Sequence, residues 1–290
     1  MIMKALVVEG GAMRGIFAAG VLDTFIEKDY YPFDFAIGVS AGASNLVGYL
    51  AKQYHRSYNV ITELATDSQF YNPRRFVKGG NLVDVNWLVS ESEKRYPVNT
   101  EALFSNTPML ATTTNIDTGL ADYYQVTPCN LEQVLEATAA LPLAYKRTPC
   151  FSGGCYTDGG VADSIPVIEA YHQGAKEITV ILSHPLSYEM PKSKSSWIIK
   201  RLLRKYPMIG KAMAERSTRY NQTLEFIRNP PQGVTVRVIS PPETFRIKRL
   251  TMNTSLLNEG YDMGLSEGKK HLASRQGVYG LTDENCHFCL

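Results

Sequence analysis

The sequence predicts a single α/β domain in which helices cover both faces of a mostly parallel sheet. Short apolar segments of strand length alternate with longer segments of helical periodicity, which is the pattern of stacked β-α-β units. In the first unit, apolar strands over residues 5–8 and 33–39 flank an amphipathic helix over 16–28, so the two strands are parallel. The chain has 290 residues, of which 44% are hydrophobic and 20% charged, a composition that supports a sizeable core.

The composition also narrows the class of function. The formal net charge of +2 is close to neutral, so we expect no nucleic-acid partner. No early segment has the pattern of a signal peptide, and no apolar run approaches the ~20 residues of a membrane span. The five cysteines form no regular framework, which favours reduced thiols. We therefore expect a cytoplasmic protein.

A glycine-rich turn at residues 9–15 (EGGAMRG) joins the first strand to its helix. Its spacing resembles a degenerate dinucleotide fingerprint, but that motif needs an acidic residue at the end of the second strand, where this chain has Ser40. Alternatively, the free backbone N–H groups of the turn form an oxyanion hole for the charge that develops on an attacked carbonyl. We favour the oxyanion hole.

Residues 38–42 (GVSAG) have the G-x-S-x-G pattern of a nucleophile elbow. The strand over 33–39 runs directly into Ser40, and a helix over 43–51 follows. Such a turn holds the serine in strained backbone space and requires small neighbours, here Ala41 and Gly42. A pattern with three fixed positions also arises by chance, so the strand-to-helix context is what favours a nucleophile.

The middle of the chain has weaker periodicity. Residues 53–95 contain short helical segments between turns, and they form either a lid or substrate wall or an ordinary surface excursion. A strand over 108–114 follows, with a partner over 123–126. Asn130 and Gln133 have the spacing of a capping box at the start of a helix that Pro142 ends.

The second half of the chain continues the alternation. A short strand at 155–157 delivers Asp158 into a double-glycine turn, which suits a carboxylate presented beside a site, although Asp-Gly is also a common tight turn. The remaining expected elements are a helix over 166–174, strands over 177–182 and 234–239, and a helix over 255–274.

Three motifs occur in one order: residues 10–15 (GGAMRG), 38–42 (GVSAG) and 158–160 (DGG). Together they resemble the patatin-like phospholipases, lipid acyl hydrolases that use a Ser-Asp dyad without a catalytic histidine. The resemblance extends from residue 4 to about 239 and includes the alanine-rich helix end at 137–142. Ala12 stands where many members have a third glycine, and Thr138 where many have serine. The resemblance implies a patatin-like three-layer α/β/α sandwich with a mostly parallel central sheet.

The resemblance also implies roles for individual residues. Ser40 would be the nucleophile and Asp158 the base, and the substrate a lipid or other ester. The implied supporting residues are the oxyanion donors Gly10, Gly11 and Ala12, the loop supports Arg14 and Gly15, and the motif glycines Gly38, Gly42, Gly159 and Gly160. Elbow geometry adds the amide of Ala41 as a further donor. We expect no metal and no cofactor.

Three rival interpretations stay open. An α/β-hydrolase with a Ser-Asp-His triad would take its base from His184, His271 or His287, although that fold usually places its serine after several strands. A Rossmann-type nucleotide-binding module is weakened by the missing acidic residue. A non-catalytic lipid-binding scaffold would keep the motifs without turnover.

The last sequence feature is a basic amphipathic segment at residues 192–219. Its charged residues are Lys192, Lys194, Lys200, Arg201, Arg204, Lys205, Lys211, Arg216 and Arg219, set against the single acid Glu215. It predicts either peripheral contact with an anionic membrane at its inner surface, through Trp197, Lys200, Arg201, Arg204 and Lys205, or a core-packing helix with a solvated basic face.

We expect residues 1–240 to form the catalytic domain, with 192–219 inside it. Residues 241–290 should form a C-terminal helical extension packed on the same domain, ending in a flexible tail. The tail sequence at 286–289 (CHFC) offers three crowded ligands where a structural zinc site needs four, so we do not expect a metal there.

Overall fold

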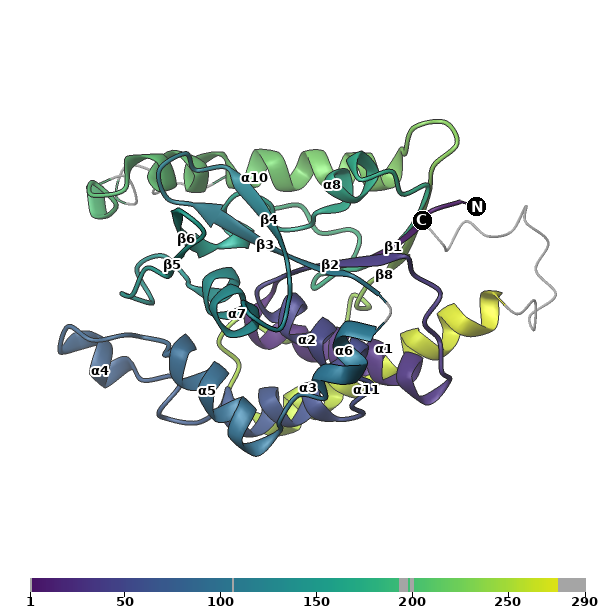
Figure 1. The fold of residues 1–290 in the computed structure, drawn as a ribbon, viewed down its shortest axis with the longest axis horizontal. Coiled ribbons are helices and arrows are strands. Elements are labelled where there is room, and N and C mark those ends of the chain that lie inside the picture. The colour runs from purple at the N-terminus through teal and green to yellow at the C-terminus, as the bar shows by residue number, and fades with distance from the viewer. Residues whose placement is uncertain (1, 106, 193–197, 199–200, 276–290) are drawn as a thin grey trace.

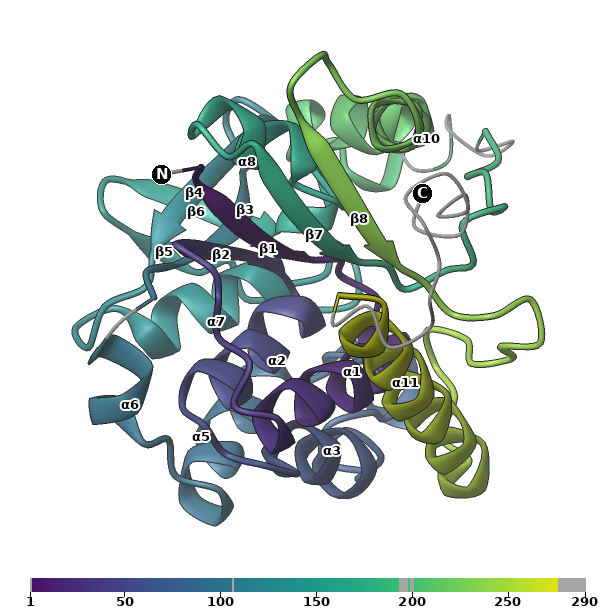
Figure 2. The ribbon, with the colours of Figure 1, turned by 90° about the vertical axis from the view of Figure 1, so that its right-hand side faces the viewer.

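The computed structural model describes residues 2–105, 107–192, 198 and 201–275, and it shows a mostly parallel sheet between layers of helices (Figures 1 and 2). Among these residues the sheet has eight strands: β1 (Lys4–Val8), β2 (Phe35–Val39), β3 (Met109–Asn115), β4 (Ala121–Gln125), β5 (Cys150–Phe151), β6 (Gly154–Asp158), β7 (Glu177–Ile181) and β8 (Thr235–Ile239). Five strands run parallel in the order β3-β2-β1-β7-β8, and β4, β5 and β6 add antiparallel pairings at the β3 side. The predicted α/β/α sandwich is confirmed.

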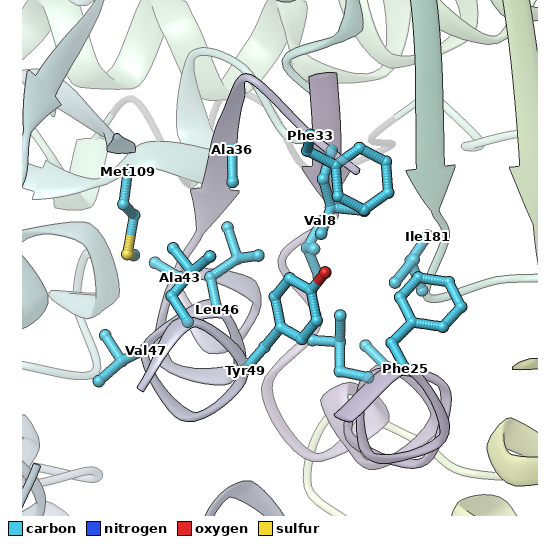
Figure 3. Packing of buried hydrophobic residues seen from close by; sticks show 14 of the residues in the cluster. Val8, Phe25, Phe33, Ala36, Ala43, Leu46, Val47, Tyr49, Met109 and Ile181 are labelled. Atoms are coloured by element: carbon cyan, nitrogen blue, oxygen red, sulfur yellow. The ribbon is translucent and has the colours of Figure 1, made fainter. Parts of the chain in front are cut away.

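One face of the sheet is covered by α1 (Gly15–Glu27), α2 (Ala41–Leu50), α7 (Leu131–Ala139) and α11 (Thr254–Arg275) (Figure 1). Successive strand side chains alternate between the two faces, so Leu6 and Val8 point into this layer. There they join Phe25 of α1 and Tyr49 of α2 in a continuous apolar cluster (Figure 3). This packing fixes the first helices at the end of the sheet where β1 and β2 terminate.

The other face is covered by α8 (Val167–His172) and α10 (Pro207–Arg228) (Figures 1 and 2). Ala5 and Val7, the alternate residues of β1, pack there against Tyr220 and Leu224 of α10. Strands buried on both faces are continuously apolar, which is why their sequence pattern was easy to detect.

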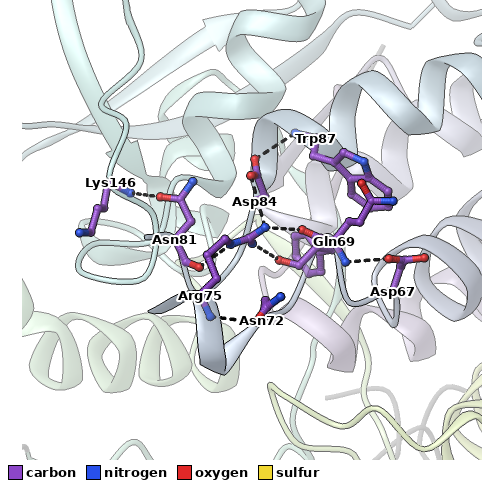
Figure 4. Close-up of polar contacts among 9 residues, drawn as sticks. Asp67, Gln69, Asn72, Arg75, Asn81, Asp84, Trp87 and Lys146 are labelled. Carbon is purple, nitrogen blue, oxygen red and sulfur yellow. Dashed lines mark hydrogen bonds and ion pairs between the residues drawn. The ribbon is translucent and has the colours of Figure 1, made fainter. Parts of the chain in front are cut away.

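Residues 56–105 form a chain of short helices beneath the first layer: α3 (Arg56–Asn59), the π-helix η2 (Val60–Leu64), α4 (Pro73–Val77), α5 (Val85–Arg95) and α6 (Thr100–Ser105). Arg75 ties the turn around α4 together by donating to the carbonyls of Gln69 and Asn81, both at 2.8 Å (Figure 4). The N–H of Leu82 donates to the Ala144 carbonyl at 2.8 Å, which docks this segment on the loop after α7.

The structure corrects the expectation of reduced thiols. Cys150 and Cys155 are direct cross-strand partners in the β5–β6 hairpin, and they form a disulfide. Their turn places Ser152 and Gly153 at positive φ, the conformation of a tight hairpin turn that brings the two strands together. Cys129 is a free thiol, and Cys286 and Cys289 lie outside the described residues. The cytoplasmic location, which rested partly on the cysteines, stays a prediction.

One helix start differs from expectation. Asn130 occupies the N-cap of α7, but its side chain accepts from the N–H of Thr127 at 2.8 Å and caps no helical N–H, so the predicted capping box is wrong in its bonding. Pro207 is the first residue of the 22-residue α10, where its fixed φ suits a helix start. In the part of the chain that the structure describes, no helix has both the length and the apolar character to cross a membrane.

Candidate active site

Ser40 lies at the carboxyl end of β2, in the sharp turn into α2. Its φ of 52° and ψ of −123° are strained for a residue with a side chain. The Ser40 N–H donates to Thr138 Oγ1 at 2.9 Å, and Thr138 Oγ1 donates to the Thr112 carbonyl at 2.6 Å, so a buried threonine holds the turn on β3. A side chain at Gly42 would collide with the Val8 carbonyl of β1. The turn thus has the geometry that the G-x-S-x-G spacing predicts.

Asp158 ends β6 and begins the short 3-10 helix η3 (Gly159–Val161), with its side chain buried beside Ser40. Its Oδ1 accepts from the Gly160 N–H at 2.8 Å, and Asp158 and Ser40 line the same cavity. Burial raises the pKa of Asp158, and this outweighs the opposing effects of the Ser40 hydroxyl, the Gly160 N–H, Arg216 and Arg249. A carboxylate of raised proton affinity next to a hydroxyl has the chemistry of a general base.

The glycine-rich turn follows β1, the strand next to β2, and leads through the 3-10 helix η1 (Ala12–Arg14) into α1. Within the described residues, no acceptor is found for the backbone N–H groups of Gly10, Gly11 and Ala12. All three line one cavity with Ser40 and Asp158, as free donors for a developing oxyanion must. Ala12 has a φ of 50°, a conformation that favours glycine and explains glycine at this position in many family members.

A buried ionic network supports this turn from below. Arg14 donates to Ser183 Oγ from Nε at 3.3 Å and from Nη2 at 3.2 Å, and Glu9 accepts from the Ser183 N–H at 2.6 Å and from the Tyr220 hydroxyl at 3.1 Å. Burial raises the pKa of Glu9, and the positive charge of Arg14 opposes that rise. Arg14, for which loop support is predicted, thus contacts Ser183. The sequence did not reveal Glu9, Ser183 and Tyr220 as members of this network.

Two cavities meet at Ser40. The first, called here the apolar cavity, has a volume of about 120 Å³ and runs between α2 and the short helices of 56–95. It is lined chiefly by apolar side chains, among them Met13, Val60, Ile61, Phe70, Val83, Val85, Leu88, Val89, Leu135, Leu141, Leu250 and Met252. The 53–95 segment is therefore a cavity wall, one of the two alternatives that its sequence left open.

The second, called here the arginine cavity, has a volume of about 260 Å³ and is lined by Asp158 and by the glycine-rich turn at residues 10–12, which we call the oxyanion turn after its predicted role. Arg216 of α10 and Arg249, from the loop between β8 and α11, also line it. Residues common to the two cavities are Ala12, Ser40, Val83, Leu141, Arg249 and Leu250. Neither arginine was recognised as a site residue from the sequence, because their approach to Ser40 is created by tertiary packing.

The basic segment divides into two parts. Arg216 and Arg219 point inward and donate to backbone carbonyls of the loop after Asp158, at Gly160 and at Ala162, so they are not available as membrane cations. Leu203 is buried against Ile209, whereas Ile198 and Leu202 are 40% and 62% exposed. Arg201, Arg204 and Lys205 are exposed, and Trp197 and Lys200 lie outside the described residues.

Of the histidines considered for a rival triad, His271 lies away from the glycine-rich turn and His184 has a strongly lowered pKa. His271 is buried against Phe25 near the C-terminal end of α1, whereas the oxyanion turn lies at the opposite end of that helix. His184 stacks on Tyr188, and burial together with the charges of Arg14, Arg249 and Arg216 lowers its pKa to about 3. His287 lies outside the described residues. The cavity that Ser40 and Asp158 line together has neither His184 nor His271 in its lining.

The parallel sheet, the serine elbow after its second strand and the aspartate at its antiparallel edge define the protein as patatin-like in class. The family model described as patatin-like phospholipase matches residues 6–171, and a model for a domain of unknown function, DUF6363, matches residues 206–277. The uncharacterized protein YjjU of Escherichia coli (strain K12) is 35% identical over 278 residues, which cover 93% of this chain and 77% of YjjU.

A solved structure, that of VipD from Legionella pneumophila, is similar with 13% sequence identity and a TM-score of 0.39, over 93% of this chain and 67% of that one. The family match and the relative of 35% identity together establish membership. The chain belongs to the patatin-like phospholipase family, a family of lipid acyl hydrolases.

Proposed function

We propose that the protein is a serine acyl hydrolase that cleaves carboxylic ester bonds of lipids, as a phospholipase A, lysophospholipase or acylglycerol lipase does. Ser40 is the nucleophile and Asp158 the base. The observation that carries the proposal is a strained elbow serine that shares a cavity with a buried carboxylate of raised pKa, where an apolar and a polar cavity meet.

In the acylation step, Ser40 Oγ attacks the ester carbonyl carbon while Asp158 takes the hydroxyl proton. The carbonyl oxygen becomes an oxyanion, to which the N–H groups of Gly10, Gly11, Ala12 and Ala41 donate. Collapse of this intermediate breaks the ester bond, and the leaving alcohol takes the proton from Asp158. Water then attacks the acyl-Ser40 ester and gives a proton to Asp158, which returns it to Ser40 Oγ as the fatty acid leaves.

The apolar cavity is the place for the acyl chain. Its walls come from α2, η2, α5 and α7, and Ser40 and Ala41 form its inner end. An ester bound with its carbonyl at Ser40 would lay its hydrocarbon along Val60, Val85 and Leu88 and remove it from water, which contributes roughly 0.8 kcal/mol per buried methylene. The leaving alcohol would then lie in the arginine cavity.

The test combines labelling and hydrolysis. We expect a fluorophosphonate to label the wild-type protein rapidly, and Ser40→Ala and Asp158→Asn each to lower ester hydrolysis by about 10³-fold or more. Because the two residues act as a unit, the double variant should be no slower than the worse single variant. Ser90→Ala, an exposed serine on α5, is the control and should retain labelling and activity.

The His184→Gln variant separates the dyad from a triad. A fall in activity of the size seen with Asp158→Asn would assign the base to His184 and overturn the dyad. A panel of phospholipids, lysophospholipids, acylglycerols and short p-nitrophenyl esters then identifies the substrate class. If the wild-type protein is not labelled by the fluorophosphonate and hydrolyses none of these esters, a non-catalytic lipid-binding scaffold is favoured.

We also propose that the exposed part of the basic segment contacts anionic membranes. Its residues Leu202 and Lys205 line a groove together with Pro142 and Leu143, and Pro142 also lines the arginine cavity. Exposed Leu143 and Leu202 thus lie next to the entrance of the site, in company with Arg201 and Arg204. A surface with apolar side chains among cations suits the interface of an anionic bilayer, where the proposed substrate resides.

A further inference from the structure

The arginine cavity contains more positive charge than its carboxylates compensate. Its lining includes two arginines, Arg216 and Arg249, and one carboxylate, that of Asp158. The positive charges of both arginines lower the pKa of Asp158, and in the described chain no carboxylate lies within ion-pair distance of the Arg249 guanidinium. One carboxylate therefore faces two guanidinium groups, which leaves the lining with an excess of positive charge.

Hydrogen bonds of the surrounding loop position Arg249 at the cavity. The Arg249 carbonyl accepts from the N–H of Met13, at 3.4 Å, which ties its loop to the oxyanion turn. The N–H of Lys248 donates to Thr251 Oγ1 at 2.8 Å and closes a turn around Arg249, while Ile247 is anchored in the core. The same loop supplies Leu250 and Met252 to the apolar cavity, so Arg249 stands at the junction between the two cavities.

Arg216 forms the inner wall behind this position. Its Nε donates to the Gly160 carbonyl, and its Nη2 donates to Ser164 Oγ at 3.1 Å, which fixes the guanidinium on the loop after Asp158. Burial and the nearby charge of Arg249 lower the pKa of Arg216 to about 10. Two guanidiniums that repel one another in this way gain if an anion binds between them.

We propose that Arg249, backed by Arg216, forms an anion subsite that binds a phosphate on the leaving alcohol of the substrate. Guanidinium groups bind phosphate oxygens by charge-assisted, often bidentate hydrogen bonds. An ester with its acyl chain in the apolar cavity and its carbonyl at Ser40 extends its alcohol toward these arginines. Arg249 is thus a specificity-determining residue that selects phosphate-bearing esters over neutral acylglycerols.

The proposed subsite assigns a role in substrate binding to residues 206–277. Both arginines lie in the region matched by the domain of unknown function, whereas Ser40 and Asp158 lie in the region matched by the patatin-like model. One region would supply the reacting groups and the other the selection of the leaving group. The inference rests on the proposed function for its orientation of the substrate, but the binding of an anion is measurable without turnover.

Binding is tested with sn-glycerol 3-phosphate, a phosphate-bearing alcohol without an acyl chain. In calorimetry at constant ionic strength, we expect it to bind the wild-type protein, glycerol not to bind, and Arg249→Ala to weaken binding about 10-fold or more. Arg246→Ala is the matched control, because Arg246 belongs to the same loop but pairs with Glu259 at 3.5 Å and lines neither cavity. Butyrate tests whether the subsite prefers a product carboxylate, and inorganic phosphate tests whether it binds any free anion. Tighter binding of butyrate than of sn-glycerol 3-phosphate would overturn the proposal.

Selection is tested with two substrates that differ only in the phosphate, 1-hexanoylglycerol and 1-hexanoylglycerol 3-phosphate. We expect Arg249→Ala to lower kcat/KM on the phosphate ester by about 10- to 100-fold and on the neutral ester by less than about threefold, with Arg249→Lys in between. Equal loss on both esters would assign Arg249 a structural role, and no loss on either would remove the subsite. Binding of glycerol 3-phosphate without hydrolysis of any ester would instead leave the subsite standing and overturn the proposed function.

Discussion

The negative charge of the buried Asp158 carboxylate lowers the stability of the folded state. Burial raises its pKa, so the folded protein binds a proton at this site more tightly than the unfolded chain does. The contribution of Asp158 to stability is therefore fully present below the unfolded pKa of about 3.9 and is lost as the pH rises through the raised folded pKa. The ionised base required by the proposed mechanism exists only above that raised pKa.

We accordingly expect Asp158→Asn to melt at a higher temperature than the wild type at neutral pH, while it loses hydrolysis. The difference in Tm should shrink as the pH is lowered through the raised pKa, because the wild-type carboxyl then also becomes neutral. Thermal unfolding from pH 3 to 8 measures this, with Asp29→Asn as an exposed control. A variant that is less stable at neutral pH would show that the charge of Asp158 is needed to compensate Arg216.

The role of Thr138 became visible only in the structure. Its buried hydroxyl accepts from the Ser40 N–H and donates to the Thr112 carbonyl, so it carries the strained turn. We expect Thr138→Val to lower the free energy of unfolding by about 1–3 kcal/mol and hydrolysis by an order of magnitude, because both hydrogen bonds are lost while the volume is kept. Thr138→Ser keeps the hydroxyl and should retain most activity. Chemical denaturation and initial rates measure both variants, and full activity in Thr138→Val would contradict the role.

The residues predicted from the sequence share one property: their signals are local. Ser40 and Asp158 stand in short motifs next to glycines, where the chain itself must turn sharply. Thr138 was noticed only as a departure from a family pattern, and Arg249 not at all. Their contacts with the site cross about 100 residues or more of sequence, and no local pattern records such contacts.

At the scale of elements, the helix pair α1 and α11 is the tightest contact in the first layer. Gly20 of α1 faces α11 so closely that a Cβ would collide with the Tyr261 carbonyl, and a Cβ on Gly264 would collide with the Phe17 carbonyl. The buried Asp23 of α1 accepts a hydrogen bond from the Tyr261 hydroxyl of α11 at 2.7 Å, which joins the two helices. Since α1 begins at the oxyanion turn, α11 holds that turn in place from behind.

Gly264→Ala tests this contact. In an exposed helix the change from glycine to alanine would stabilise by about 1 kcal/mol, but here the added methyl group must separate two backbones, at a cost of about 1–3 kcal/mol. We expect a lower free energy of unfolding in urea. Ser266→Ala, an exposed position two residues further along α11, should be nearly neutral. A stabilised Gly264→Ala variant would mean that the two helices are less tightly packed than the structure has them.

The bounds of an element were predicted more accurately where the element is more deeply buried. β1 and β2 are apolar on both faces, and the predicted bounds of all five parallel strands agree with the observed ones to within about two residues. The 56–95 segment was harder, because its helices are short and one is a π-helix. The bounds of α10 were not predicted, because its apolar face is interrupted by Arg216 and Arg219, which point inward to donate to carbonyls. The cross-strand disulfide depends on the β5–β6 register, which the cysteine spacing alone does not reveal.

At the scale of the whole molecule, the entrance to the site and the exposed part of the basic segment lie side by side. Pro142 lines both the arginine cavity and the groove beneath Leu202 and Lys205. α10 and α11 lie in opposite layers of the sandwich (Figure 1), and the 206–277 region reaches the site through Arg216 of α10 and Arg249 of the loop before α11. A protein that docks through the Leu202 side would bring its entrance toward the bilayer surface.

The charge-reversed triple variant Arg201→Glu, Arg204→Glu and Lys205→Glu tests this docking. Each basic residue near an anionic surface contributes about 1 kcal/mol, so reversal at three positions should abolish co-sedimentation with vesicles rich in phosphatidylglycerol and make the residual binding insensitive to salt. Activity on those vesicles should fall with it, while activity on a soluble short-chain ester stays unchanged. The matched control reverses Lys28, Lys269 and Lys270, three exposed lysines in the α1–α11 region, which changes the net charge equally and should leave vesicle binding intact. Equal loss of vesicle binding in both variants would show that only the net charge matters. If the triple variant also loses activity on the soluble ester, the segment is a structural element of the site.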